Sequence, residues 1–198
     1  MNSDHIQVLL IEDNPGDARL IREMLTEVEG TPFDLECAER LSDGLARLSA
    51  GGIDAVLLDL SLPDGQGADT FARMHAHAPR VPIIVMTGHE DEALGVQLVE
   101  HGAQEYLVKG QVTSPLLARA IRHAIERKGS EEALRKSETR FRSLIENASD
   151  LILILNPDHT IAYVSPSVER ILGHTVAAVS GARITDFIDP PDLPNFIA

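Results

Sequence analysis

The sequence predicts an α/β protein with a doubly wound, five-stranded parallel sheet, followed by a long helix and an incomplete α+β segment. Three observations predict it. Apolar runs such as Val8–Ile11 and Val56–Leu58 lack polar alternation, which is typical of strands buried on both faces. Five such runs alternate with helical patterns over residues 1–128, and this order implies right-handed crossovers and a parallel sheet. After Asp150 the pattern changes to that of a hairpin.

The predicted strands and helices alternate in order along the chain. The strands span residues 6–11, 34–38, 54–59, 81–86 and 106–108. The helices begin at Pro15, run over residues 42–50, surround Phe71 and Met74, run over residues 90–101, and begin at Ser114. Asn14 can cap the first helix, and Asp17 faces the positive end of its dipole. Ser42 is expected to cap the second helix.

The last of these helices is expected to continue as a linker. Gly129 and Ser130 are expected to interrupt it before Glu131 restarts it. A short heptad seam then follows, at spacings of three and four: Leu134, Ser137, Phe141, Leu144 and Ala148. Two interpretations stay open: an amphipathic helix lying on its own domain, or a homodimeric coiled coil through residues 130–148.

The residue pattern of the C-terminal segment predicts a small and incomplete unit. Residues 151–155 and 160–164 read as a hairpin, a short helix follows from Ser165 to Leu172, and the rest is expected to be loop. About fifty residues can hardly complete a domain around two strands. We therefore predict three parts, over residues 1–128, 129–147 and 148–198, with net charges of −10, 0 and −4.

Composition and charge disfavour several classes of function. The net charge of −14 disfavours binding to nucleic acid or to anionic membranes. No apolar stretch approaches the roughly 20 residues that a membrane helix needs, and the N-terminus lacks the pattern of a signal peptide. Cys37 is the single cysteine, which suits a reducing compartment. These features predict a cytoplasmic protein.

Five polar residues follow or end different apolar runs, and parallel strands would bring them to one edge: Glu12, Asp13, Asp59, Thr87 and Lys109. Three carboxylates that crowd together need a cation, and Mg²⁺ prefers oxygen ligands. A lysine and a hydroxyl at the same edge can bind phosphoryl oxygens. An aspartate beside a metal can attack phosphorus and form an acyl phosphate.

The same residues carry a resemblance to a family. The segments Glu12-Asp13, Asp59–Gly67, Met86–Gly88 and Tyr106–Lys109 resemble, in order and spacing over residues 6–128, the flavodoxin-like receiver domain of bacterial response regulators. The resemblance implies that Asp59 accepts a phosphoryl group from a phosphohistidine. The partner would be a sensor histidine kinase or a phosphotransfer protein in a two-component phosphorelay.

The resemblance also implies a role for each site residue. Mg²⁺ would be held by Asp13, Asp59 and the backbone carbonyl of Ser61, with Glu12 acting through water. Three further residues would respond to the phosphoryl group: Thr87 by bonding its oxygen, Tyr106 by rotating inward, and Lys109 by pairing with it. Gly88 fits a position that the family keeps small. Gly110 departs from the family, which usually has proline there, so the bond from Lys109 to Gly110 should be trans.

The C-terminal segment resembles the start of a PAS domain, on the run Phe141–Asp150, the hairpin, and the run Tyr163–Ser167. The later strands that close the PAS sheet are missing, so we expect no cofactor here and an exposed hairpin edge that invites pairing.

The leading hypothesis is a phosphorylation switch whose effect passes from Asp59 to the face of the last helices, and along the linker to the PAS-like segment. The chain shows no kinase catalytic domain and no basic helix-turn-helix; self-dephosphorylation is compatible with this reading. A haloacid-dehalogenase-like phosphatase would need an aspartate where Ser61 stands. A dimerisation scaffold with a vestigial pocket is the alternative. The chain could also be the front part of a larger sensor protein.

Overall fold

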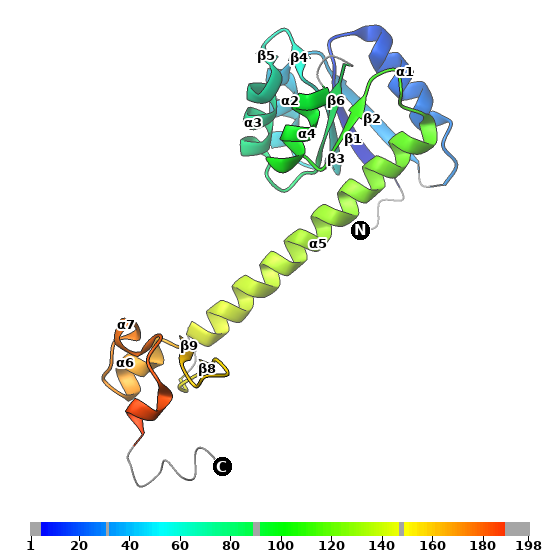
Figure 1. Cartoon of the computed structure of the whole chain (residues 1–198). Coiled ribbons are helices and arrows are strands. Elements are labelled where there is room, and N and C mark those ends of the chain that lie inside the picture. Colours follow the sequence, from blue (N-terminus) through cyan, green and yellow to red (C-terminus); the bar gives the residue numbers. More distant parts are fainter. Residues whose placement is uncertain (1–4, 31, 89–91, 147–148, 189–198) are drawn as a thin grey trace. The chain divides into compact units, whose positions relative to one another are not determined.

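The structure is a computed structural model that describes residues 5–30, 32–88, 92–146 and 149–188. The chain divides into two compact units, Met1–Glu132 and Ala133–Ala198 (Figure 1). The start predicted at Glu90 for the fourth helix and the last prolines of the chain lie outside the described residues.

The first unit is built on a five-stranded parallel sheet, as predicted. Its strands are β1 (Ile6–Ile11), β2 (Phe33–Ala38), β3 (Ala55–Asp59), β6 (Ile83–Thr87) and β7 (Glu105–Val108), in the spatial order β2-β1-β3-β6-β7. The helices are α1 (Pro15–Thr26), α2 (Leu41–Ser49), α3 (Gly67–His77), α4 (Glu92–Glu100) and α5 (Ser114–Glu146). The reversal of strand order at β1 and β3 is the topological switch point at which such sheets bind ligands.

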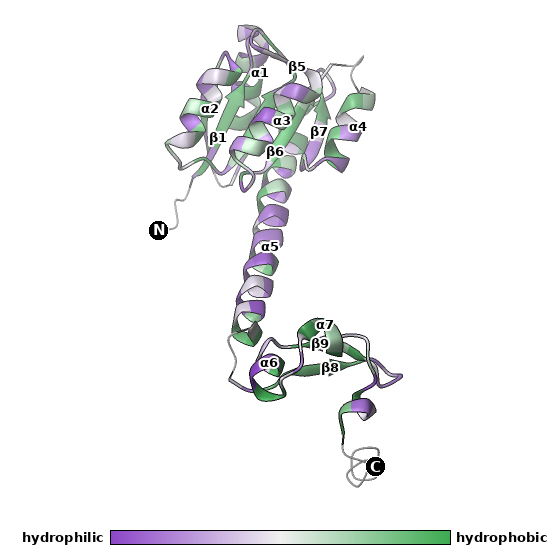
Figure 2. Cartoon of the chain, turned by 90° about the vertical axis from the view of Figure 1, so that its left-hand side faces the viewer, coloured by the Kyte–Doolittle hydropathy of each residue, from purple (hydrophilic) through white to green (hydrophobic). Residues whose placement is uncertain are grey.

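The unalternating apolar runs are explained by two hydrophobic layers. Leu9 and Leu58 point into the layer under α2, α3 and α4, whereas Leu10 and Leu57 point into the layer under α1 and α5. Figure 2 shows the strands of this sheet as largely hydrophobic, between helices of mixed character. Burying each large side chain contributes about 1.5–3 kcal/mol. The sheet is therefore held from both sides, and its strand ends have fixed positions.

The cap of α2 differs from the prediction. The residue before α2 is Arg40, which makes no capping side-chain bond, and Ser42 lies inside the helix. Instead, the carboxylate of Asp64 accepts the backbone N–H groups of Leu41 and Ser42, at 2.8 and 2.9 Å. These bonds lower the pKa of the Asp64 carboxyl. Asp64 occupies the tight turn between β4 (Ser61–Leu62) and β5 (Gly65–Gln66), so this turn caps a helix more than twenty residues earlier in the chain.

The expected interruption at Gly129 and Ser130 is wrong, because α5 runs without a break from Ser114 to Glu146. Nothing lies within 4 Å of a Cβ built on Gly129, so this glycine shows no tertiary need for a bend. A single glycine lowers helix stability by about 1 kcal/mol, which the neighbouring helical residues outweigh.

The second unit has the predicted hairpin, formed by β8 (Leu153–Leu155) and β9 (Ile161–Val164), and the predicted short helix, α6 (Ser167–Ile171). The expected loop that follows is wrong in two places, since α7 (Val176–Val179) and a 3₁₀ helix, η2 (Ile184–Phe187), lie there. Five buried side chains explain this order by forming a small core: Ile161, Val164, Val168, Val179 and Ile184. Val179 and Ile184 thus pack with residues of the hairpin, whereas the cap of α7 is local, since the Ala178 N–H donates to the Thr175 hydroxyl at 3.3 Å.

Two glycines should respond in opposite ways to alanine. A Cβ on Gly44 of α2 would lie 2.3 Å from Cδ1 of the fully buried Ile11, so Gly44→Ala should lower the free energy of unfolding by about 1–3 kcal/mol. Gly129→Ala should raise it by up to about 1 kcal/mol, because the site is open and helical. Urea denaturation followed by circular dichroism would measure both. A stabilised Gly44→Ala variant would contradict the packing of α2 on β1.

Candidate functional site: an acidic pocket at the sheet edge

The five predicted residues meet at the carboxyl edge of the sheet. Glu12 and Asp13 follow β1, Asp59 ends β3, Thr87 ends β6, and Lys109 follows β7. The strand pairing places these ends together, since Asp59 lies opposite Met86 on β6 and Thr87 lies opposite Val108 on β7. The ends of four neighbouring strands thus form one pocket.

Three carboxylates converge closely enough to share one ion. Carboxylate oxygens of Glu12, Asp13 and Asp59 all lie within 4.8 Å of one another. Glu12 and Asp59 are buried, at 2% and 6% exposure, whereas Asp13 is exposed. Buried oxygen ligands with one side open to solvent suit a hard divalent cation that keeps some of its water. The donor set therefore fits a metal ion of the magnesium class.

Lys109 sits among carboxylates as the counter-charge of the pocket. Its ammonium lies 2.6 Å from Glu12 Oε2, 2.9 Å from Asp59 Oδ2 and 3.1 Å from Asp17 Oδ2. Burial alone would lower the pKa of Lys109, but the hydrogen bonds to Glu12 and Asp59 outweigh it and raise that pKa above its ordinary value. Burial raises the pKa of Glu12 although the Lys109 hydrogen bond opposes it, and the Asp59 charge adds to the rise. One ammonium leaves this pocket net negative, which favours a second cation.

Thr87 and Tyr106 lie on the neighbouring strands β6 and β7. The Thr87 hydroxyl is buried and has no hydrogen-bond partner within the described part of the chain. Tyr106 is half-buried, and its ring lies so close to Gly95 of α4 that a Cβ on Gly95 would be 2.8 Å from it. Gly88, next to Thr87, is exposed and has open space around its Cα. Ser61 lies beside the pocket, where its N–H donates to Asp59 Oδ1 at 3.3 Å.

Asp17 has a second role that the sequence analysis did not predict. It was expected to interact with the helix dipole, and it does lie in the first turn of α1. Its carboxylate also contacts Lys109. The available signal was its spacing, because the first turn of a helix that starts just after Asp13 stays at the same edge of the sheet.

Gly110 gives the loop after Lys109 a conformation that proline cannot adopt. The Lys109–Gly110 bond is trans, as predicted, and Gly110 has φ +84°. The Gln111 N–H donates to the Val108 carbonyl at 3.1 Å, which closes a four-residue turn with Gly110 in its third position. A positive φ there is the mark of a type II turn, for which glycine is preferred. Proline is locked near −65°.

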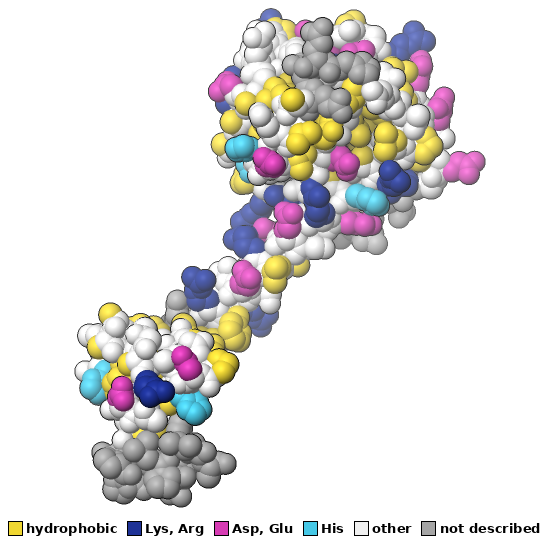
Figure 3. All heavy atoms as spheres, viewed as in Figure 1, with side chains coloured by type: hydrophobic (Ala, Val, Ile, Leu, Met, Phe, Trp, Pro, Cys, Tyr) yellow, Lys and Arg dark blue, Asp and Glu magenta, His cyan; other side chains and the backbone are white. Residues whose placement is uncertain are grey.

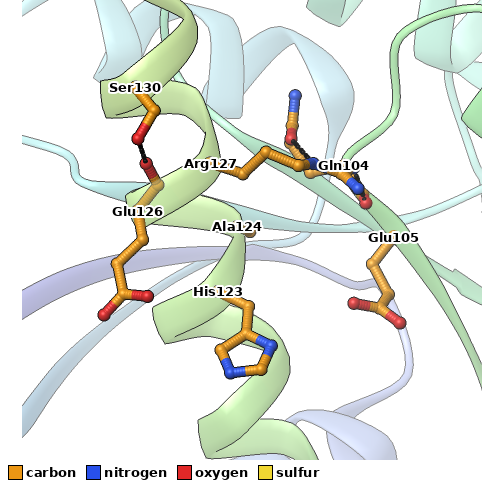
Figure 4. A pocket seen from close by; sticks show the side chains of 7 residues that line it. All are labelled: Gln104, Glu105, His123, Ala124, Glu126, Arg127 and Ser130. Carbon is orange, nitrogen blue, oxygen red and sulfur yellow. Dashed lines mark hydrogen bonds between the residues drawn. The ribbon is translucent and has the colours of Figure 1, made fainter.

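Another hollow lies at the opposite edge of the sheet, between the start of β7 and α5 (Figure 4). Arg127 of α5 points to Gln104, donating to its side-chain oxygen at 2.7 Å and also to its backbone carbonyl. Arg127 and Gln104 thus bind each other and fasten α5 to the start of β7. The acidic pocket is the better candidate for chemistry.

Two protein-family models match the chain. The response regulator receiver domain matches residues 8–122, and the PAS fold matches residues 139–197. The chain belongs to the response regulator receiver family. The resemblances drawn from the motifs are confirmed, and so is the order of a receiver domain followed by a PAS segment.

Curated relatives agree over the receiver domain. The chain is 32% identical over 114 residues to the swarming motility regulation protein RssB of Serratia marcescens, covering 58% of this chain and 51% of that protein. It is 34% identical over 120 residues to the KDP operon transcriptional regulatory protein KdpE of Escherichia coli, covering 61% and 51%. The sensor histidine kinase TmoS of Ectopseudomonas mendocina is 26% identical over 208 residues, which cover 87% of this chain and 21% of TmoS. The chain thus spans about half or less of these relatives.

Solved structures agree as well. The response regulator receiver domain protein from Clostridium thermocellum matches with a TM-score of 0.56 and 28% identity, covering 63% of this chain and 97% of that one. The signal receiver domain of an HD domain-containing protein from Pseudomonas fluorescens Pf-5 matches with a TM-score of 0.58 and 25% identity, covering 67% and 96%. Across the part of the chain that the structure describes, no helix has an apolar stretch that could cross a membrane.

The turn at Gly110 should be sensitive to substitution. Gly110→Ala should lower the free energy of unfolding by about 1 kcal/mol, because a Cβ disfavours positive φ. Gly52→Ala is the matched control, since Gly52 has φ +80° and equally open space away from the pocket. Gly110→Pro should cost more than Gly110→Ala, because proline excludes this φ altogether. If urea denaturation finds Gly110→Pro as stable as the wild type, the turn described here is wrong.

Proposed function

We propose that this chain is a phosphoacceptor response regulator of a two-component phosphorelay and that Asp59 is its phosphoacceptor. The observation that carries the proposal is the position of Asp59. It ends the central strand, and its carboxylate lies 2.9 Å from the Lys109 ammonium and within 4.8 Å of the Glu12 and Asp13 oxygens. A carboxylate oxygen of Asp59 attacks phosphorus and forms an O–P bond. The P–N bond of the donor phosphohistidine breaks, and its electron pair leaves with the imidazole.

The residues around Asp59 divide the remaining tasks. Asp13, Asp59 and the backbone carbonyl of Ser61 would hold Mg²⁺, with Glu12 acting through water. The ion, when bound, supplies charge neutralisation for the transferring group. Lys109 is already in hydrogen-bonding distance of Asp59 and pairs with the phosphoryl oxygens after transfer. The existing ion pair between Lys109 and Asp59 supports this assignment.

Thr87 and Tyr106 form the proposed switch. The buried Thr87 hydroxyl lacks a protein partner among the described residues, so a phosphoryl oxygen would satisfy it. Movement of Thr87 toward Asp59 frees space behind it, into which Tyr106 rotates from its place against α4. The resulting change in the face of α4, β7 and α5 passes along α5 to the PAS segment.

The partners and the setting complete the proposal. The phosphodonor is a sensor histidine kinase or a phosphotransfer protein, and the chain acts in the cytoplasm without nucleic-acid or membrane partners. Three functional parts remain our proposed division: a receiver over 1–128, a linker over 129–147 and a PAS-like segment over 148–198 that binds no cofactor. The alternative is a dimerisation scaffold whose acidic pocket is vestigial.

Phosphorylation tests the proposal directly. The full chain with Mg²⁺ and acetyl phosphate should gain one phosphoryl group by intact-mass spectrometry, and Asp59→Asn should gain none, since an amide is a poor nucleophile. The control is Asp69→Asn, an exposed carboxylate on α3, which should be modified like the wild type. A wild type that stays unmodified, and does not bind beryllofluoride either, would favour the scaffold alternative.

We also propose that residues 130–148 form a parallel homodimer. Leu134, Phe141 and Leu144 are 62%, 62% and 64% exposed, and they follow the seven-residue pattern of a two-helix seam. Figure 3 shows hydrophobic side chains on the surface of the long helix. A self-complementary stripe of this kind is best covered by the same stripe of a second copy.

Charge placed on the stripe should prevent that dimer. Phe141→Glu combined with Leu144→Glu should shift sedimentation from dimer to monomer, because buried carboxylates at a seam are strongly unfavourable. Thr139→Glu is the control, since Thr139 lies on the other face of the helix and is exposed. A wild type that sediments as a monomer at high concentration would exclude this interface.

A further inference from the structure

Lys109 has three carboxylate partners, and one of them lies outside the group of residues assigned above. An ammonium has three N–H groups. Here it has three carboxylate oxygens within 3.1 Å, from Glu12, Asp59 and Asp17. Glu12 and Asp59 belong to the metal and phosphoryl chemistry. Asp17 does not, because its oxygens are not among the three carboxylates that converge within 4.8 Å.

The start of α1 fixes Asp17 beside the pocket. Asn14 caps the helix by accepting the N–H groups of Gly16 and Asp17, at 2.9 and 3.4 Å. The Asn14 N–H in turn donates to Glu12 Oε1 at 3.1 Å. Pro15 follows with its restricted φ. The same short segment therefore positions Glu12 inside the pocket and Asp17 at its rim, where the Asp17 side chain is 38% exposed.

The proposed reaction changes two of the three partners of Lys109. Phosphoryl transfer turns the Asp59 carboxylate into an acyl phosphate, which removes its negative charge from the oxygen that forms the new bond. Glu12 would be engaged by the hydrated Mg²⁺. The bond to Asp17 involves no reacting atom and no metal ligand, so it can persist while the other two are exchanged.

From this arrangement we propose that Asp17 is a positioning residue for the phosphoryl-transfer reaction. It anchors the Lys109 ammonium through one N–H, so that the other N–H groups turn from the carboxylates to the phosphoryl oxygens. The proposal rests on the function proposed above for Asp59 and adds a residue to it.

The loop after Lys109 gives a reason for such an anchor. Gly110 follows at φ +84°, and glycine leaves the backbone next to the lysine with more conformational freedom than a proline would. A side-chain anchor on α1 compensates by fixing the ammonium itself. Gly110 thus allows the backbone beside Lys109 more freedom, and Asp17 restricts the position of the Lys109 side chain.

The opposite role for Asp17 makes a contrary prediction. If its charge mainly repels the incoming phosphoryl group, removing the charge should speed phosphorylation. If Asp17 anchors Lys109, removing it should slow phosphorylation. The sign of the effect separates the two roles.

The test uses the full chain with Asp17→Asn, and with Asp17→Glu as the conservative variant. Asp17→Asn should lower the rate of phosphorylation by acetyl phosphate and the affinity for beryllofluoride, both by roughly tenfold, because it removes a close ion pair with Lys109 at a partly exposed site. Asp17→Glu should restore part of both losses. Mg²⁺ affinity, measured by titration calorimetry, should not weaken, because Asp17 is not a ligand.

A second background separates positioning from general damage. With Lys109→Ala already present, Asp17→Asn should cause no further loss, since its partner is gone. Asp43→Asn, an exposed carboxylate in the first turn of α2, controls for helix-dipole effects and should behave as the wild type. An unchanged or faster Asp17→Asn variant, or a tenfold loss that persists without Lys109, would overturn the inference alone. A wild type that takes up neither phosphoryl group nor beryllofluoride would overturn the proposed function along with it.

Discussion

The structure of the first unit depends on how it accommodates the repulsion between carboxylates at one edge of its sheet. Glu12, Asp13, Asp59 and Asp17 bring four carboxylates to one place, where the ammonium of Lys109 pairs with three of them and offsets only part of their charge. Two of these carboxylates are largely buried, and buried like charges are costly unless they are paired. The sheet and its helices hold these side chains together in a donor set that fits a divalent cation.

Packing on both faces of the sheet fixes the strand ends that carry these carboxylates. Helices cover both faces of the sheet, and β3 and β6 are buried along their whole length, so β1, β3, β6 and β7 bring their polar residues to the same edge. Packing is tight enough that α2 approaches β1 through Gly44, where a methyl group has no room. The apolar contacts on both sides of the sheet thus fix the positions of the polar side chains at its edge.

Sequence reasoning succeeded where local pattern and topology agree. Runs such as Val56–Leu58 predicted buried strands, and parallel topology then predicted that Glu12, Asp59 and Lys109 would meet. It failed where a partner lies far away in sequence: the cap of α2 comes from Asp64, and α7 and η2 are ordered by contacts with the hairpin. It also gave too much weight to one weak local signal, the glycine at position 129, within a helix that continues on both sides. For Asp17, the sequence predicted the interaction with the dipole of its own helix but not the ion pair with Lys109. Lys109 is far away along the chain, so no local pattern connects the two residues.

The turn that holds Asp64 has a mechanical consequence for the pocket. The segment that leaves Asp59 is short, and at Asp64 it is tied to the N-terminus of α2 by two hydrogen bonds. Moving the segment from Asp59 to Asp64 would break the two hydrogen bonds that cap α2, so this side of the pocket is firmly held. On the Thr87 side, the described residues offer no hydrogen-bond partner to the Thr87 hydroxyl, and, its chain neighbours aside, none of them lies within 4 Å of a Cβ built on Gly88. If Asp59 is modified as proposed, we therefore expect the backbone to shift on the Thr87 side of the pocket and to stay in place on the α2 side.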